Sequence, residues 1–246
     1  MQPGLSPLAL YVDNPRDVAD RAVAAYGVGL HTTGGGVPEK AAKAGISPLE
    51  YAIGYYTNPK NYFAHYVVDT DGTRVQIANE REAAQHIGRF PNYPNKNPDR
   101  REQYMDGSWV KLAPPVVVQA WLDQWGHKYK HPYQLFPGPY PNQAYVGIEM
   151  IPIWPTPPKG RLRFTPVQHQ SVAELCADIG KRNKFPHDWW NMSRLAGHED
   201  ISPLDRFDKG GMWDPGFGRP DFYFDFPLVR GLTAEYTRRP PAPINA

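Results

Sequence analysis

The sequence predicts an α/β domain in which buried strands alternate with capped helices. Three observations favour this class. Two apolar runs, at 24–31 and 144–151, are typical of buried strands. A β-rich hairpin lies between them, and two Ser/Thr-Pro-x-Glu/Gln segments indicate helix starts. At 246 residues, one elaborated domain spanning 1–246 is the simplest organisation.

The first elements lead to a histidine. A helix is expected from Pro15 to about Val23, because Asp13 or Asn14 can cap it and proline is tolerated at the first helical position. The strand predicted at 24–31 ends at His31. The glycine-rich loop that follows could turn a side chain toward a cleft.

A helix and a hairpin come next. Ser47 and Glu50 have the spacing of a capping box, which predicts a helix to about Tyr56. Two β-rich runs, 62–69 and 73–78, are joined by Thr-Asp-Gly, and the Asp-Gly pair favours a tight turn. We therefore expect two antiparallel strands.

The region 90–141 is rich in Pro, Tyr and Asn and is interpreted as an insertion with one helix at 116–128. Its aromatic residues suit packing against the sheet as well as a rim that grips glycan or peptide. The strand predicted after it places Val146, Ile148 and Met150 on one face and Glu149 on the other. Glu149 is thus a carboxylate in an otherwise apolar strand.

The C-terminal third begins with a second helix start at Thr165. The residues expected on one buried face of that helix are Val172, Leu175, Cys176 and Ile179. Beyond it, 197–218 is rich in Gly, Pro and Asp and is expected to be an irregular loop, and the Pro-rich tail at 239–246 is expected to fray.

Composition excludes several classes of partner and site. The net charge of +2, without basic blocks, gives no indication of nucleic-acid binding. No apolar run reaches about 18 residues, so we expect no membrane insertion. No basic residue precedes the first apolar stretch, so we expect no secretion signal and a protein that is cytoplasmic as synthesised. We also expect a monomer. Cys176 is the only cysteine, so a metal would have to use histidines and carboxylates.

Zinc hydrolases commonly use three protein ligands and leave the fourth position to water, whose pKa the metal lowers to about 7. His31, His198 and Asp214 could supply two imidazoles and a carboxylate. They are far apart in the sequence and form no compact motif such as H-E-x-x-H, so spacing alone leaves the assignment open.

Five short segments resemble, in order, the motifs of the type-2 N-acetylmuramoyl-L-alanine amidases, a family that includes phage endolysins, bacterial recycling amidases and animal peptidoglycan recognition proteins. The resemblance covers about 24–216. The segments are LHTT at 30–33, AHYVVD at 64–69 followed by DGT at 71–73, QHIG at 85–88, VGIE at 146–149, and GHEDISP at 197–203 with DPG at 214–216.

The resemblance implies a mixed central sheet flanked by helices and a zinc ion held by His31, His198 and Asp214. Glu149 matches the family's general base, which can take a proton from water and pass it to the leaving amide nitrogen. His86 matches a cleft position, which implies contact with substrate.

Several assignments have competitors within this sequence. Asp200, Asp205 and Asp208 compete with Asp214, which we favour because Pro215 and Gly216 complete the motif. His65 is as well explained by a hydrogen-bonded core position as by substrate contact. The remaining histidines carry no supporting pattern and are expected to be solvated or structural: His127, His131, His169 and His187.

The family often has a basic residue two positions before the last zinc ligand, where it stabilises the oxyanion. Here that position is Met212. Lys209, followed by two glycines, is the nearest replacement, and Arg206 is another candidate.

The resemblance implies hydrolysis of the lactyl amide bond between N-acetylmuramic acid and L-alanine in peptidoglycan or muropeptides, with Zn²⁺ as cofactor. Two settings fit, a phage endolysin and a recycling enzyme, and the large aromatic insertion favours the endolysin because it suits a polymer. The rivals are a non-catalytic peptidoglycan-binding protein and a zinc peptidase that cuts within the stem peptide.

Overall fold

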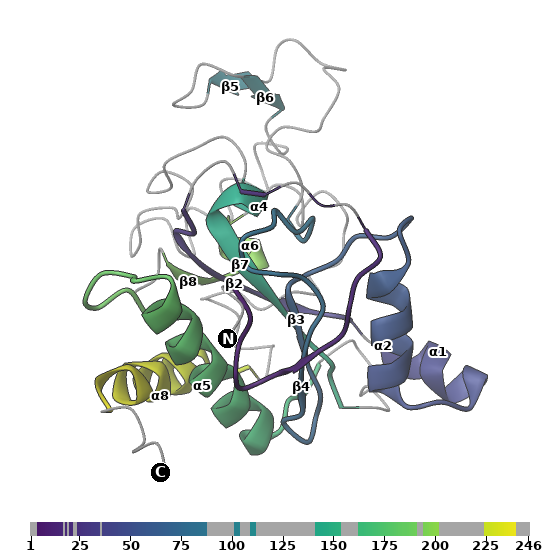
Figure 1. Cartoon of the computed structure of the whole chain (residues 1–246). Coiled ribbons are helices and arrows are strands. Elements are labelled where there is room, and N and C mark those ends of the chain that lie inside the picture. Colours follow the sequence, from purple (N-terminus) through teal and green to yellow (C-terminus); the bar gives the residue numbers. More distant parts are fainter. Residues whose placement is uncertain are drawn as a thin grey trace.

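The structure is a computed structural model (Figure 1). For 101–103 and 109–111 it describes the backbone only. The described residues are 4–16, 18, 20–21, 24–34, 36–87, 101–103, 109–111, 141–153, 162–190, 194–201 and 224–239.

Six strands form one mixed sheet, as predicted. Across the sheet they are β1 (Leu10–Tyr11), β4 (Arg74–Gln76), β3 (Tyr66–Val68), β7 (Tyr145–Met150), β2 (Gly27–Thr32) and β8 (Leu195–Gly197). All neighbours are parallel except β3 and β4, which are the predicted hairpin. A separate antiparallel pair, β5 (Arg101–Gln103) and β6 (Trp109–Lys111), falls within the predicted insertion.

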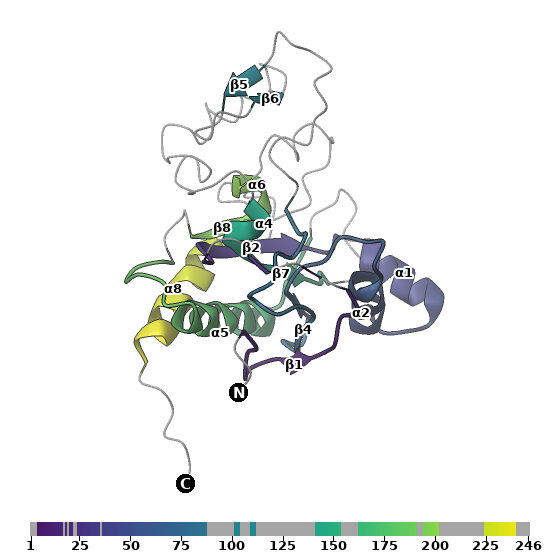
Figure 2. The same cartoon turned by 45° about the horizontal axis from the view of Figure 1, so that its top comes forward.

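Helices flank the sheet. The longer ones are α1 (Gly36–Ala44), α2 (Pro48–Thr57), α5 (Pro166–Arg182) and α8 (Phe226–Arg238), and the one-turn helices are α4 (Pro141–Ala144) and α6 (His198–Ile201). Figures 1 and 2 show α5 and α8 together on one side of the sheet and α1 beside α2 away from them. Within the described residues, no helix has the length and apolar character needed to cross a bilayer.

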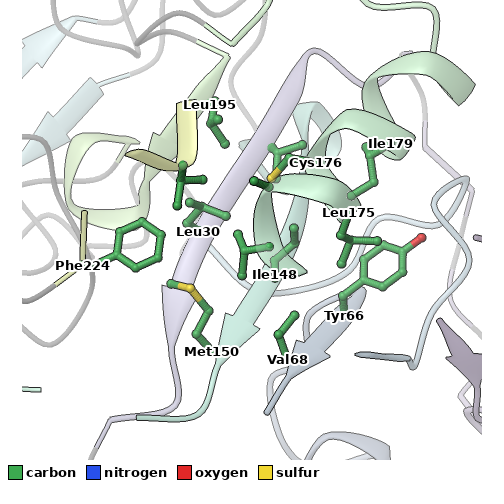
Figure 3. Close-up of a cluster of buried hydrophobic side chains, with 14 of the residues drawn as sticks. Leu30, Tyr66, Val68, Ile148, Met150, Leu175, Cys176, Ile179, Leu195 and Phe224 are labelled. Atoms are coloured by element: carbon green, nitrogen blue, oxygen red, sulfur yellow. The ribbon is translucent and has the colours of Figure 1, made fainter. Parts of the chain in front are cut away.

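The main core lies between the sheet and α5 (Figure 3). Alternation along β2 and β7 turns Leu30, Ile148 and Met150 toward this helix, and Glu149 belongs to the opposite face. The predicted apolar face of α5 is buried there, including Cys176, so the prediction that this cysteine is a core residue is confirmed. Burial raises the pKa of the Cys176 thiol, as expected for an unreactive core position.

The two predicted helix starts differ in detail. Ser47 and Glu50 form the complete capping box at α2. Thr165 caps α5 by accepting the Gln168 backbone N–H at 3.0 Å. The Gln168 side chain, however, donates to the backbone oxygens of Val68 and Ile151, so it fastens α5 to the ends of two strands instead of closing a box.

The helix predicted from Pro15 to Val23 is wrong. Its described residues, 15–16, 18 and 20–21, are not helical, and Asp20 forms a β-bridge with Glu82. The side chains of Arg16 and Arg21 donate to backbone oxygens of distant segments, among them Asn61 O and Glu80 O, each at 2.6 Å. These tertiary hydrogen bonds hold the segment in a non-helical conformation and override its local helix signals.

Other predicted elements are present with shifted ends or lie outside the described residues. The strands predicted at 24–31, 62–69, 73–78 and 144–151 occur at 27–32, 66–68, 74–76 and 145–150. The irregular loop predicted at 197–218 is wrong at its start, because Gly197 pairs with β2 as the last residue of β8 and His198–Ile201 forms α6. The rest of that loop beyond Ile201, the helix predicted at 116–128 and the tail beyond Arg239 lie outside the described part of the chain. The single-domain organisation stays a prediction.

Candidate active site

Three predicted site residues meet at the carboxyl ends of neighbouring parallel strands. In the register of β2 and β7, His31 lies opposite Glu149. In the register of β2 and β8, Leu30 lies opposite Gly197, so His198 follows at the very end of β8. The carboxyl ends of parallel strands are the usual place for ligand sites in α/β sheets.

The two histidines are buried and in contact. Their ring centroids lie 4.6 Å apart at an interplanar angle of 65°. His31 is 1% exposed, His198 is 2% exposed and Glu149 is 8% exposed. The site therefore combines two imidazoles and a carboxylate on the sheet face opposite α5, and their burial makes charge interactions stronger than they are in water.

His86 lies directly against His31. Its Nδ1 is 2.8 Å from His31 Nε2, and its Nε2 is 3.0 Å from the backbone oxygen of Tyr145. Burial, followed by the effects of Arg21 and His198, lowers the pKa of His86 to about 3, so this ring is neutral at physiological pH. Its predicted contact with substrate stays a prediction, since both ring nitrogens face protein atoms.

Two residues that support this site were not predicted from the sequence. Asn142 Oδ1 accepts the backbone N–H groups of His86 and Ile87, at 3.0 and 2.7 Å. Arg21, which burial brings to a pKa of about 10, donates to backbone oxygens of Glu80 and Tyr145. No local pattern marks either residue, because each acts on segments that are distant in sequence.

The other described histidines have structural or solvent-exposed positions. His65 is fully buried; its Nδ1 accepts the Gly147 N–H at 2.9 Å, and burial together with nearby Arg21 lowers its pKa. His169 connects the start of α5 to the residue before α8, through Thr165 O and Asp225 N. The side chain of His187 is 79% exposed. These findings confirm the expectation for His169 and His187 and favour the core interpretation of His65.

The chemistry of the buried donors fits zinc, which prefers imidazole nitrogen and carboxylate oxygen at sites without thiolates. Within the part of the chain that the structure describes, no group of three or more His, Cys, Asp or Glu side chains could hold a metal. The predicted third ligand, Asp214, lies outside that part, as do Lys209, Arg206 and Met212. The site as described is therefore a His-His-Glu arrangement, and the role of Asp214 stays a prediction.

A known protein family covers most of the chain. A sequence profile of a family described as N-acetylmuramoyl-L-alanine amidase matches residues 24–217. No curated protein matches the chain.

Among solved structures, the chain is similar to a selenomethionine derivative of AmpD, with 18% identity, 94% of this chain and 98% of that chain covered, and a TM-score of 0.49. It is similar to Citrobacter freundii AmpD in solution, with 18% identity, coverage of 95% and 94%, and a TM-score of 0.44. It is also similar to the N-acetylmuramoyl-L-alanine amidase LysC from Clostridium intestinale URNW, with 13% identity, coverage of 92% and 97%, and a TM-score of 0.37.

Proposed function

Because the chain belongs to the N-acetylmuramoyl-L-alanine amidase family, we propose that it is a zinc-dependent hydrolase of the lactyl amide bond between N-acetylmuramic acid and L-alanine. The observation that supports this most is the meeting of His31, His198 and Glu149 at the carboxyl ends of three adjacent strands. All three lie within the residues that the family profile matches.

In the proposed site, His31, His198 and Asp214 would hold the metal. When bound there, zinc supplies Lewis acidity that polarises the amide carbonyl and makes water more acidic. Glu149 acts as general base and then as general acid. It takes a proton from the attacking water as the new C–O bond forms, and it gives that proton to the L-alanine nitrogen as the C–N bond breaks.

The burial of the site supports this assignment of roles. Glu149 belongs to a rigid strand and lies opposite His31 in the register, so its carboxylate is held beside the proposed metal ligands. A buried carboxylate exchanges protons with reactants more readily than with bulk solvent, because its environment excludes most water. The chain's contribution is thus to orient the base beside the proposed metal ligands and to shield it from bulk solvent.

The products formed from purified peptidoglycan test the proposed reaction. We expect mass spectrometry to detect free stem peptides that begin with L-alanine, together with glycan strands that carry an intact lactyl carboxylate. Cuts within the stem would instead indicate a zinc peptidase. A polymer that is bound and left unchanged would indicate a non-catalytic peptidoglycan-binding protein.

The biological setting is proposed to be that of an endolysin, supported by the long aromatic insertion at 90–141, which suits a polymeric substrate. The alternative is a recycling enzyme that acts on soluble muropeptides. The two settings differ in substrate preference. An endolysin releases stem peptides from intact sacculi, whereas a recycling enzyme prefers small anhydro-muropeptides and leaves sacculi largely uncut.

The family often has a basic residue at the position that Met212 occupies here. Lys209 is proposed to stabilise the oxyanion in its place. We expect Lys209→Ala to lower kcat by about 10²–10³-fold with little change in KM, the cost of losing one oxyanion donor. The double variant Lys209→Ala/Met212→Lys should recover much of this loss, and steady-state kinetics on a muropeptide measures it. If Lys209→Ala kept full activity and Arg206→Ala lost it, Arg206 would be the residue that stabilises the oxyanion.

A further inference from the structure

We propose that His86 is a positioning residue: it accepts the Nε2–H of His31 and thereby leaves the lone pair of His31 on Nδ1, the nitrogen that would then bind the proposed metal. Only the presence of a metal depends on the proposed function. The hydrogen-bond chain itself belongs to the described residues.

The direction of this chain follows from the nature of its last acceptor. A backbone oxygen only accepts, so His86 Nε2, 3.0 Å from Tyr145 O, must carry the ring proton. A neutral imidazole has one N–H, so His86 Nδ1 has the lone pair. His31 Nε2, 2.8 Å away, is then the donor, and the lone pair of His31 lies on its Nδ1.

Arg21 reinforces the neutral form of His86. Its Nη2 donates to the same Tyr145 oxygen at 2.9 Å, so a fixed positive charge already lies at the end of the chain. A second charge on the buried His86 ring would be repelled by the guanidinium and poorly solvated. The carbonyl of Tyr145 therefore determines which nitrogen of His86 carries the single proton.

The His86 ring is held in place from two directions. A Cβ added to Gly147 would come within 2.5 Å of His86 Cγ and Nδ1, so the ring packs onto the bare backbone of β7. Asn142 Oδ1 accepts the backbone N–H of His86 and that of the next residue, which anchors the main chain. Glycine at 147 is thus required by the close approach of an aromatic ring, a packing constraint that accounts for this residue type in the centre of a strand.

In a metal site, this hydrogen-bond chain would fix the tautomer of His31 before the metal binds. A ligating histidine usually donates its second N–H to a carboxylate, backbone carbonyl or water, which fixes the tautomer and the ring orientation. Here the acceptor is another imidazole, whose own tautomer is fixed by a backbone carbonyl. The site would therefore present Nδ1 of His31 to the metal without first having to move a proton.

The tautomers can be read directly in the metal-free, full-length protein by long-range ¹H–¹⁵N NMR of its imidazoles. We expect the proton of His31 on Nε2 and that of His86 on Nε2. A wild-type His31 with its proton on Nδ1 would overturn the proposal without any variant being made.

Zinc affinity, measured by competition with a chelator, gives the second readout. His86→Leu and Gly147→Ala should weaken affinity by about 10–100-fold, because one removes the acceptor and the other displaces the ring. His86→Gln, whose amide offers both an acceptor and a donor, should recover most of the affinity. His187→Leu, which removes an exposed histidine, is the matched control and should bind zinc as the wild type does.

Equal zinc affinity in His86→Leu and the wild type, with an unchanged His31 tautomer, would contradict the proposal. A wild-type chain that shows the expected tautomers and takes up no zinc would support the hydrogen-bond chain while contradicting the proposed function. The two failures are therefore distinguishable.

Discussion

The variant His198→Ala is expected to lose both its zinc and its amidase activity. His198 is 2% exposed, and its ring packs against that of His31, so its removal takes one of two buried imidazoles from the proposed metal site. The wild type should carry about one zinc per chain and the variant close to none, because binding depends on the full ligand set.

The expected loss of activity is large. A Lewis acid contributes several kcal/mol to such a reaction, and about 1.4 kcal/mol corresponds to a tenfold change in rate. We therefore expect a fall of about 10³-fold or more in kcat/KM. Metal content by elemental analysis and release of L-alanine stem peptides are the two measurements, and His187→Ala is the control that removes an exposed histidine. Stoichiometric zinc in His198→Ala would count heavily against the assignment of the ligands.

The variant Glu149→Gln is expected to keep its zinc and to lose most of its turnover. Glutamine has nearly the shape of glutamate, so packing on the strand is retained, whereas the group that accepts a proton is lost. General acid–base catalysis is worth about 10²–10⁴-fold, which is the fall in kcat that we expect. KM should change little, because the carboxylate is proposed to act on protons and not to bind the glycan.

The pH dependence of the rate separates this role from a structural one. The acid limb of the wild-type profile, which reports protonation of the general base, should be absent from Glu149→Gln. Glu39→Gln, on the exposed surface of α1, serves as the control and should leave rate and profile unchanged. An unchanged kcat in Glu149→Gln would remove Glu149 from the mechanism. A parallel loss of zinc would make it a metal ligand instead.

Local patterns predicted the elements that carry the site well. The alternation along 144–151 placed Glu149 on the face opposite Val146, Ile148 and Met150, and the structure confirms this, with those three residues in the core against α5. The Asp-Gly turn between β3 and β4 and the capping box at Ser47 were also correct. Each of these features depends on residues within a few positions of one another, so the physical cause is complete in the sequence.

Local patterns failed where distant segments supply the partners. The predicted helix at 15–23 has suitable capping residues, yet the side chains of Arg16 and Arg21 donate to backbone oxygens of distant segments, and the backbone N–H of Arg21 donates to the distant Arg81 oxygen. The side chain of Gln168 likewise donates to two strand carbonyls and does not complete the capping box of its own helix. In both cases the competing hydrogen bonds are buried or partly buried, where leaving a polar group unpaired is costly.

The sequence by itself determined which residue types are present and which short segments form strands, turns and helix starts, because periodicity, capping and turn chemistry act over a few residues. It also carried the motifs that indicate the family. The tertiary structure alone decided that His31 lies opposite Glu149, that His198 directly follows the end of a neighbouring strand, and that His86 lies against His31 from 55 residues away. The reason is that strand order and register bring together groups whose interactions are not encoded by their spacing along the chain.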